Sequence, residues 1–264
     1  MSKLKDKTVL ITGASSGIGE AFALKCASDK CKVIISARNR EKLEKVAEKI
    51  KSLGSEAIII PADVSKSEEV RNLFQEAIKK TERIDLVLNN AGLGHVDYIW
   101  NLTSEQIEQI IDVNIKGMIL VSKYSAEIFK KQKYGHIIMT SSLAGLVTVP
   151  KWSVYCASKW AVTSFADTIR EELKTYNVKI STIHPGPVET SFFDKDKANI
   201  DTKELGDVLT VDYVVEKIYN TAFTERKKVI MPFSSKIFGF IYRLCPSLAI
   251  SLINIQILKE QKNK

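Results

Sequence analysis

Short apolar runs alternate along this chain with longer segments in which apolar residues recur at helical spacing. The apolar runs, rich in β-branched residues, predict strands at residues 8–12, 32–37, 56–61, 85–89, 135–141, 179–184 and 228–231. The segments between them predict helices at residues 17–29, 40–53, 67–81, 104–131, 153–176 and 211–224. Because this alternation is typical of βαβ units, we expect an α/β fold with a doubly wound, parallel, seven-stranded sheet and helices on both faces.

Two regions depart from this alternation. Residues 187–209 are polar and charged around Phe192 and Phe193 and follow the sixth predicted strand, at the sheet edge where ligands bind, so we expect a substrate lid. Residues 232–264 form an apolar C-terminal extension. Its two apolar stretches, 237–242 and 248–258, are both shorter than the ~18 to 20 residues that span a bilayer. Packing on the core or a neighbouring subunit and attachment to a membrane surface are both open for this extension.

The composition narrows the class of protein. A chain of 264 residues with 45% hydrophobic content can bury one large core, and we expect a single domain over residues 1–264. The four cysteines, Cys26, Cys31, Cys156 and Cys245, have neither CxxC nor Cys/His ligand spacing, so we expect reduced, mostly buried thiols and no metal site. The N-terminus lacks the apolar stretch of a secretory signal, which favours a cytoplasmic protein.

The net charge of +8 raises the question of an anionic partner. Much of the charge lies where lysines alternate with glutamates in residues 40–51, which is typical of the solvated face of a helix, and in the basic tail 259–264. No basic stripe interleaved with aromatic residues occurs, so we expect a small-molecule substrate and no nucleic acid.

Tyr155 and Lys159 are the first candidates for chemistry. They are four residues apart in a predicted helix, which places both side chains on one face. A phenol titrates near pH ~10 in isolation, and a lysine cation beside it favours the phenolate, which brings the group closer to the range useful for general acid-base catalysis. A solvated helix face is the alternative for such a pair in isolation.

A glycine-rich turn follows the first predicted strand and opens a helix. It reads Gly13-Ala14-Ser15-Ser16-Gly17-Ile18-Gly19, and the amides and dipole of a helix N-terminus favour an anion. The spacing is GxxxGxG and not GxGxxG, so the dinucleotide-binding fingerprint is matched in its context of strand, turn and helix. An ordinary glycine turn is the alternative.

The end of the second predicted strand bears on which dinucleotide would bind. A carboxylate there would accept a hydrogen bond from a ribose hydroxyl, whereas arginine pairs with a 2′-phosphate. Arg38 and Arg40 stand there without an acid, which favours NADP(H) over NAD(H) unless both are surface charges at a helix start. Asp63 and Val64, after the third strand, are candidates to hold the adenine, with a helix-capping role as the alternative for Asp63.

The chain also contains Asn90-Ala91-Gly92, Asn114, Ser142 and Pro185-Gly186, and together with the motifs above they follow one another in a single order along the sequence. Over residues 5–190 the chain resembles the classical short-chain dehydrogenase/reductase (SDR) family, in its NADP-preferring branch. The resemblance implies a Rossmann-type fold, nicotinamide-dependent interconversion of carbonyl and alcohol, and a catalytic tetrad of Asn114, Ser142, Tyr155 and Lys159. It implies cofactor contacts at Gly13, Ser15, Ser16, Gly17, Ile18, Gly19, Arg38, Asp63, Val64, Asn90, Ala91, Gly92, Thr140, Tyr155, Lys159, Pro185, Gly186, Val188 and Thr190. Ser16 stands where many NADP-dependent members carry a second basic residue.

The roles follow from the chemistry of each group. Tyr155 is expected to donate a proton to the substrate carbonyl oxygen, and Ser142 to hydrogen-bond that oxygen. Lys159 is expected to lower the pKa of Tyr155 and hold the nicotinamide ribose, and Asn114 to anchor a water that connects Lys159 to solvent. Ser141 is the rival of Ser142, and only the thirteen-residue spacing to Tyr155 in the family pattern favours Ser142.

The expected reaction is therefore hydride transfer between NADP(H) and a secondary alcohol or ketone. The apolar extension together with Phe192 and Phe193 favours a hydrophobic substrate, such as a lipid, fatty-acyl or steroid-like carbonyl. A small polar or sugar ketone and a non-catalytic dinucleotide-binding protein are the alternatives. We expect a homodimer or homotetramer.

Overall fold

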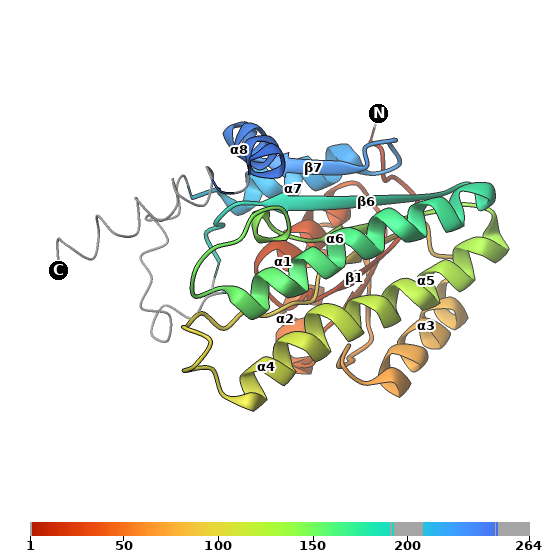
Figure 1. Cartoon of the computed structure of the whole chain (residues 1–264). Coiled ribbons are helices and arrows are strands. Elements are labelled where there is room, and N and C mark those ends of the chain that lie inside the picture. The colour runs from red at the N-terminus through yellow and green to blue at the C-terminus, as the bar shows by residue number, and fades with distance from the viewer. Residues whose placement is uncertain (1, 191, 193–207, 246, 248–264) are drawn as a thin grey trace.

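The computed structural model describes residues 2–190, 192, 208–245 and 247. Within them, seven strands form one parallel sheet in the order β3-β2-β1-β4-β5-β6-β7 (Figure 1). The strands are β1 (Thr8–Thr12), β2 (Lys32–Ser36), β3 (Glu56–Ile59), β4 (Leu86–Asn89), β5 (Gly135–Thr140), β6 (Val178–Pro185) and β7 (Lys228–Met231). All seven predicted strands are confirmed, with ends that differ by no more than two residues.

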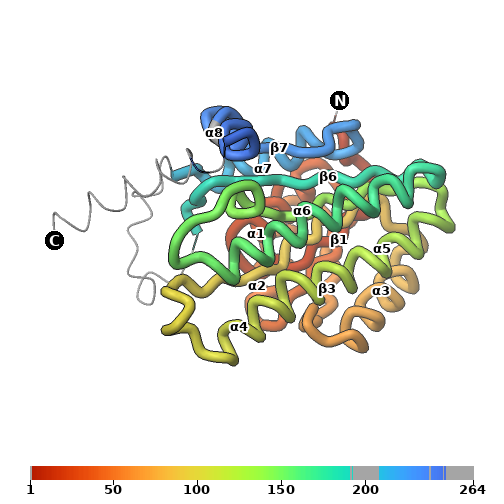
Figure 2. The backbone as a smooth tube through the Cα atoms, in the orientation of Figure 1, coloured from red at the N-terminus to blue at the C-terminus, as the bar shows by residue number. Residues whose placement is uncertain are grey.

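Helices cover both faces of the sheet, as the alternation of elements predicts. One face carries α1 (Gly17–Ser28), α2 (Arg40–Ser52) and α7 (Val211–Thr221). The other carries α3 (Ser67–Thr81), α5 (Met118–Gln132) and α6 (Ser153–Leu173), with α4 (Ser104–Ile111) leading into α5. Figures 1 and 2 show α4, α5 and α6 together on the side nearer the viewer.

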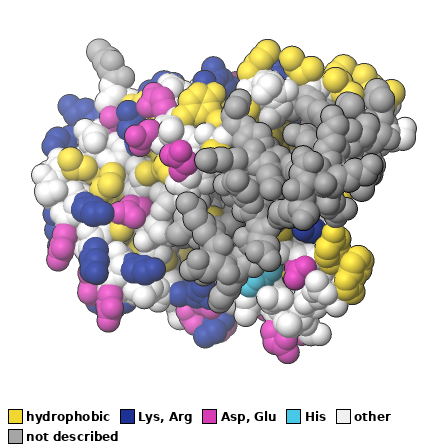
Figure 3. Space-filling view, turned by 90° about the vertical axis from the view of Figure 1, so that its left-hand side faces the viewer, with side chains coloured by type: hydrophobic (Ala, Val, Ile, Leu, Met, Phe, Trp, Pro, Cys, Tyr) yellow, Lys and Arg dark blue, Asp and Glu magenta, His cyan; other side chains and the backbone are white. Residues whose placement is uncertain are grey.

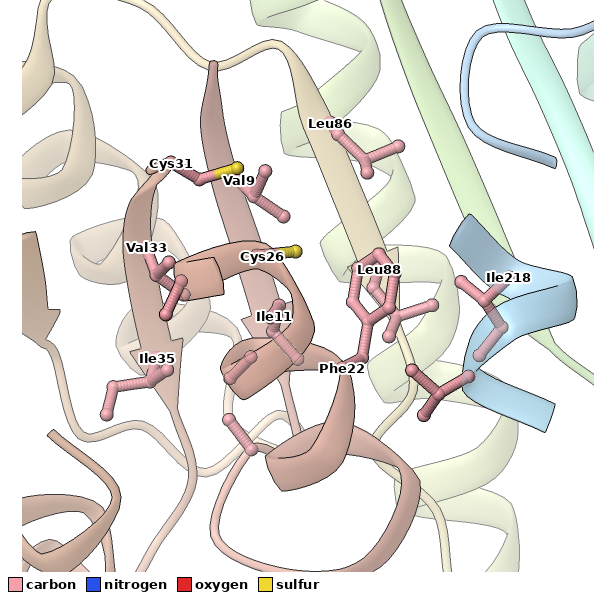
Figure 4. Packing of buried hydrophobic residues seen from close by; sticks show 14 of the residues in the cluster. Val9, Ile11, Phe22, Cys26, Cys31, Val33, Ile35, Leu86, Leu88 and Ile218 are labelled. Atoms are coloured by element: carbon pink, nitrogen blue, oxygen red, sulfur yellow. The ribbon is translucent and has the colours of Figure 1, made fainter. Parts of the chain in front are cut away.

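Side chains of the central strands alternate between the two layers of core. Val9 and Ile11 of β1 point toward α1 and α7, whereas Leu10 points toward the layer of α3, α5 and α6. In Figure 4, Val9 and Ile11 lie beside α1 with its Cys26 and Phe22, and Ile218 of α7 lies on the other side of Phe22. Because both faces of a parallel sheet are buried, its strands are apolar throughout and not alternating in polarity. This is the pattern from which the strands are predicted.

The predicted continuous helix at residues 104–131 is wrong in one respect. Between α4 and α5 the chain forms a π-helical segment, η1 (Asp112–Gly117), so the hydrogen-bond ladder shifts there. Such segments are frequent at functional sites because the extra residue turns side chains to directions that an α-helix does not allow. The end of the predicted helix at 153–176 likewise tightens into a 3₁₀ turn, η3 (Lys174–Tyr176).

A further helix, α8 (Phe233–Leu244), lies in the apolar extension, where the sequence analysis assigns no element. It follows β7 directly and lies at the top of the molecule in Figure 1. In the described part of the chain no helix combines the length and the hydropathy needed to cross a bilayer. Three of the cysteines are buried, Cys245 is exposed, and all four are free, in agreement with the expected thiols.

Candidate active site

The sequence motifs meet at the carboxyl edge of the sheet. The strand order reverses between β1 and β4, and ligands of open α/β sheets bind at such a switch point. The glycine turn follows β1, Asn90–Gly92 follows β4, the serine pair follows β5 and Gly186 follows β6. Motifs that are far apart in the sequence therefore meet at one edge of the sheet.

The glycines of the first turn are required by close backbone contacts. Gly13 has a φ of +65°, and a Cβ there would lie 2.9 Å from Ala91 Cα. A Cβ at Gly19 would lie 2.3 Å from the Gly13 carbonyl oxygen. The turn thus fits tightly against the Asn90–Gly92 segment, and larger residues are excluded.

The N-terminus of α1 faces this turn. Its N-cap is Ser16, which is exposed and, in the described part of the chain, makes no side-chain cap hydrogen bond. The first amides of a helix need a partner from outside the helix, and a phosphate suits them. Ser15, within the turn, is half-buried, and Ile18 packs against the core, so Ile18 anchors the helix start.

Thr12, at the end of β1, holds the Asn90–Gly92 turn after β4 in place. Thr12 Oγ1 accepts hydrogen bonds from the amides of Asn90 and Ala91, at 3.0 and 3.1 Å. Thr140 Oγ1 donates to Asn90 Oδ1 at 3.1 Å, which adds the end of β5 to the network. The ends of β1, β4 and β5 are therefore held in fixed positions relative to one another.

Asn114 lies in the π-helical segment and is almost fully buried. Its Oδ1 accepts from the Leu93 amide at 2.9 Å, and its Nδ2 donates to the Leu93 carbonyl at 2.8 Å and to Ser158 Oγ at 3.1 Å. A Cβ at Gly92 would lie 3.3 Å from Asn114 Oδ1 and 3.5 Å from Lys159 Nζ. Asn114 and Lys159 therefore approach the same backbone turn from two sides.

Tyr155 and Lys159 stand one turn apart on α6 and are both buried. Lys159 Nζ lies 5.5 Å from the centroid of the Tyr155 ring and donates to the Thr140 carbonyl at 3.0 Å. Burial of the ammonium lowers the pKa of Lys159 to about 8. The two side chains share one buried environment, so the alternative of a solvated helix face is wrong.

The pKa of Tyr155 departs from the sequence-based expectation. Burial of the hydroxyl raises the pKa of Tyr155, and a side-chain hydrogen bond with Ser142 lowers it only in part. The expected net lowering of the Tyr155 pKa is therefore wrong, because desolvation of the phenolate outweighs the hydrogen bond with Ser142. The hydroxyl is therefore protonated at neutral pH and available as a proton donor.

The structure separates Ser141 from Ser142. The Ser141 hydroxyl is buried and bonds the Lys159 carbonyl and Thr163 Oγ1, each at 3.1 Å. Ser142 Oγ accepts from the Ala144 amide at 3.1 Å, at the start of η2 (Leu143–Gly145), and its side chain bonds Tyr155. Ser141 therefore fastens β5 to α6, and Ser142 faces the phenol.

Arg38, after β2, and Asp63, after β3, lie near enough for the charge of Arg38 to act on the Asp63 carboxylate. Arg38 is exposed after β2, whereas Arg40 Nε is bonded to Glu44 at 3.0 Å. Burial raises the pKa of Asp63, but hydrogen bonds from Ser65 and the charge of Arg38 bring it below its ordinary value. The bonds from Ser65 are those of a local turn that precedes α3.

Val64 and the segment after β6 hold the remaining residues that are expected to contact the cofactor. Val64 is buried against Gly117 of the π-helical segment, where a Cβ would lie 2.8 Å from Val64 Cγ2. Pro185 ends β6, and the Gly186 amide donates to the Met231 carbonyl at 2.8 Å. Thr190 reaches back to the glycine turn, since a Cβ at Gly17 would lie 3.2 Å from Thr190 Cγ2. The chain after β6 therefore returns to the glycine turn.

The two ends of the predicted lid at residues 187–209 are paired. Val188 and Leu209 form a β-bridge, and the Leu209 amide donates to the Pro187 carbonyl at 2.8 Å. Phe192 packs edge-on against Tyr155, with ring centroids 6.1 Å apart. Residue 191 and residues 193–207, including Phe193, lie outside the described residues.

Sequence reasoning missed the contact of one buried histidine that shapes this site. Buried His184 bonds the Ser142 carbonyl through Nδ1 at 3.1 Å, and burial lowers the pKa of His184 to about 4, so it is neutral. Trp152 packs edge-on against Tyr155 at 5.5 Å. The only signal for His184 was its place directly before Pro185-Gly186, which does not specify a contact with Ser142.

Within the residues that the structure describes, no group of three or more His, Cys, Asp or Glu side chains is arranged to hold a metal ion.

Known proteins are similar to this chain in sequence over most of its length. Residues 7–201 match the family described as short chain dehydrogenase. An uncharacterized oxidoreductase of Listeria innocua is 39% identical over 193 residues, which cover 72% of this chain and 78% of that protein. One from Staphylococcus saprophyticus is 37% identical over 197 residues, covering 74% and 79%.

Solved structures agree with the sequence matches. A short chain dehydrogenase/reductase from Burkholderia phymatum in complex with NAD superposes with a TM-score of 0.86 at 25% identity, covering 94% of this chain and 96% of that one. The alcohol dehydrogenase of the archaeon Thermococcus sibiricus, complexed with 5-hydroxy-NADP, gives a TM-score of 0.78 at 28% identity, covering 86% and 96%. With the parallel sheet, the glycine turn and the Tyr155–Lys159 pair in place, this chain belongs to the short-chain dehydrogenase family of oxidoreductases.

Proposed function

We propose that this oxidoreductase transfers a hydride between NADP(H) and a secondary alcohol or ketone, and that its substrate is hydrophobic. The observation that carries the proposal is the buried contact of Tyr155 with both Ser142 and Lys159 at the switch point of the sheet. A protonated phenol, a serine hydroxyl and an amine at one point are what protonation of a carbonyl oxygen requires.

The residues present fit a nicotinamide dinucleotide, which when bound would supply or accept the hydride. The amides at the start of α1, where Ser16 makes no side-chain cap bond in the described part of the chain, suit the diphosphate. The missing Cβ at Gly13 lets the glycine turn pack against Ala91, which holds this helix start beside the Asn90–Gly92 segment. Lys159 Nζ is in reach of the same turn as Gly92 and would hold the nicotinamide ribose.

Arg38 supports NADP(H) as the cofactor. Its guanidinium is exposed at the end of β2 and, in the described part of the chain, has no ion pair, whereas Arg40 pairs with Glu44. A free guanidinium suits a 2′-phosphate, since the pair is charge-assisted. The solved relatives hold NAD in one case and an NADP derivative in another, so the preference of this chain rests on Arg38.

Proton transfer would proceed from Tyr155 Oη to the carbonyl oxygen in the direction of reduction. Ser142 Oγ would hydrogen-bond the same oxygen, because it already bonds the phenol. Lys159 would stabilise the phenolate that is left, from its position beside the ring. Asn114 fixes the Leu93 backbone next to Lys159 and would anchor a water that returns a proton from solvent.

An apolar surround of Tyr155 supports a hydrophobic substrate. Buried Ala144 and Trp152 contact Tyr155 in one cluster, and Val96, Val149 and Phe192 pack against it. A charged or heavily hydroxylated substrate would leave its polar groups unpaired there, which is costly. An alkyl or ring ketone has no such cost.

A cofactor and substrate panel tests the proposal. Purified protein is mixed with NADPH or NADH and with ketones that range from sugars to long-chain and polycyclic compounds, and loss of reduced nicotinamide is followed. We expect turnover with NADPH on the apolar ketones and none in Tyr155→Phe, which should still bind NADPH. Binding without turnover on any carbonyl would indicate a non-catalytic dinucleotide-binding protein, and equal activity of Tyr155→Phe would exclude the proton role.

A further inference from the structure

Helix α8 presents an apolar stripe to solvent. The stripe consists of Phe233, Ile237, Phe240, Ile241 and Leu244, which recur at the three- and four-residue spacing of one helix face. Phe233 is 71% exposed, Phe240 64% and Leu244 65%. Figure 3 shows hydrophobic side chains along the upper edge of the molecule, where Figure 1 places α8. Contiguous exposed apolar surface of this kind marks a binding face.

The opposite face of α8 is fixed to the body of the protein. Tyr242 is buried against Val147, with Leu146 and Val149 packed around them. Its hydroxyl bonds Thr148 Oγ1 at 2.7 Å. The orientation of the helix is therefore set by Tyr242, and the stripe points away from the core.

The charges beside the stripe have one sign. Lys236 and Arg243 are exposed, and the helix contains no aspartate or glutamate. Residues 232–264 as a whole carry five basic residues, Lys236, Arg243, Lys259, Lys262 and Lys264, against the single acidic Glu260. A second copy of this stripe would bring like charges together, whereas an anionic lipid surface would complement them.

We propose that α8 is an interfacial helix that binds the surface of an anionic membrane through this stripe, with the helix lying in the plane of the headgroups. Tyr242 connects the helix to residues 146–149, which lie between Ser142 and Tyr155 in the chain. Val149 packs against both the Tyr242 contact and the apolar cluster around Tyr155. The membrane-bound helix thus lies against the loop that borders the site. An apolar substrate dissolved in the bilayer is the class that this arrangement suits.

Vesicle sedimentation tests the stripe without any need for turnover, so its result is independent of the proposed reaction. The full chain is mixed with phosphatidylcholine vesicles, with or without about 30% phosphatidylglycerol. We expect the protein to sediment with the anionic vesicles and to be released when NaCl rises from about 0.05 to about 0.5 M. The double variant Phe233→Ser/Phe240→Ser should bind at least about tenfold more weakly, because two large apolar side chains no longer enter the interface.

Matched variants guard against general effects of surface mutation. Leu53→Ser changes an exposed aliphatic residue at the end of α2, and Lys45→Gln changes an exposed lysine of α2, so both should bind as the parent does. Lys236→Gln/Arg243→Gln should lose part of the preference for anionic vesicles. Circular dichroism melting confirms that each variant is folded.

Three outcomes would overturn the proposal. The first is absence of vesicle binding by the parent. If a chain truncated after Cys245 then binds although the parent does not, the C-terminal segment covers the stripe. The second is a change of oligomeric state in the Phe233→Ser/Phe240→Ser variant without lipid, which would make the stripe a subunit interface. The third is binding that survives in that variant and disappears on truncation, which would place the anchor beyond α8.

Discussion

Lys159 Nζ lies 5.5 Å from the centroid of the Tyr155 ring, and both side chains are buried on one face of α6. Burial moves the pKa of the two groups in opposite directions, down to about 8 for Lys159 and upward for Tyr155. Each group is thereby biased toward its neutral form. A neutral phenol beside an amine that titrates near neutrality is a suitable starting state for proton donation.

The lowered pKa of Lys159 predicts a pH dependence of stability. Between pH about 8 and about 10 the unfolded chain holds this proton more firmly than the folded one, so the free energy of unfolding should rise with pH. Lys159→Met should lack this part of the rise, a difference on the order of 1 to 3 kcal/mol. Urea unfolding of both proteins across this range measures it, and parallel curves would contradict the burial of a titrating amine. Above pH about 10 the raised pKa of Tyr155 acts the other way, and stability should fall in both proteins.

The different contacts of Ser141 and Ser142 predict different losses. Ser142→Ala should lower kcat about a hundredfold or more with a small change in melting temperature, because its side chain faces Tyr155 and lies on the site. Ser141→Ala removes the bonds to the Lys159 carbonyl and Thr163, and should cost about 1 to 3 kcal/mol of unfolding free energy. Kinetics and thermal melting of both variants decide the assignment. The reverse pattern would make Ser141 the catalytic serine.

The serine pair also marks where prediction from sequence ends. Strand positions follow from hydrophobic runs such as residues 8–12, because burial on both faces of a parallel sheet leaves a strong local signal. The contacts of Ser141 and Ser142 depend on how β5 meets α6, which no local pattern records. The π-helical turn at Asn114 is invisible for the same reason, since residues 104–131 read as one helix.

Helix α8 is a second case in which the sequence was insufficient. Its stripe has helical spacing, yet the sequence analysis assigns no element to this segment. The direction of the stripe is decided by one tertiary contact, Tyr242 with Thr148. Conversely, the Tyr155–Lys159 pair was predicted correctly as one helix face, because both residues lie within a single helical turn.

Arg38 predicts the cofactor preference. Arg38→Asp should raise the KM for NADPH about tenfold to a hundredfold and lower the KM for NADH, because the guanidinium is lost and a carboxylate is gained where a ribose hydroxyl would bind. Arg40→Ala is the matched control, since its guanidinium is already paired with Glu44 at 3.0 Å, and its KM values should stay near those of the parent. Steady-state kinetics with each cofactor measures both. An NADPH preference unchanged by Arg38→Asp would exclude Arg38 as the phosphate ligand.

Two glycines in different surroundings give the last prediction. A Cβ at Gly145 would lie 2.4 Å from Ser141 Oγ and 2.6 Å from the Lys159 carbonyl oxygen, so the backbone of α6 itself would have to move. Gly145→Ala should therefore lower the unfolding free energy by about 2 kcal/mol or more and reduce turnover, because Lys159 and Ser141 shift together.

At Gly239, in the middle of α8, a Cβ meets nothing within 4 Å. Gly239→Ala should stabilise the helix by about 0.5 to 1 kcal/mol through its higher helix propensity and leave turnover unchanged. Thermal melting and steady-state kinetics of the two variants provide the comparison. Equal stability of both would show that the contact between η2 and α6 is looser than these distances require.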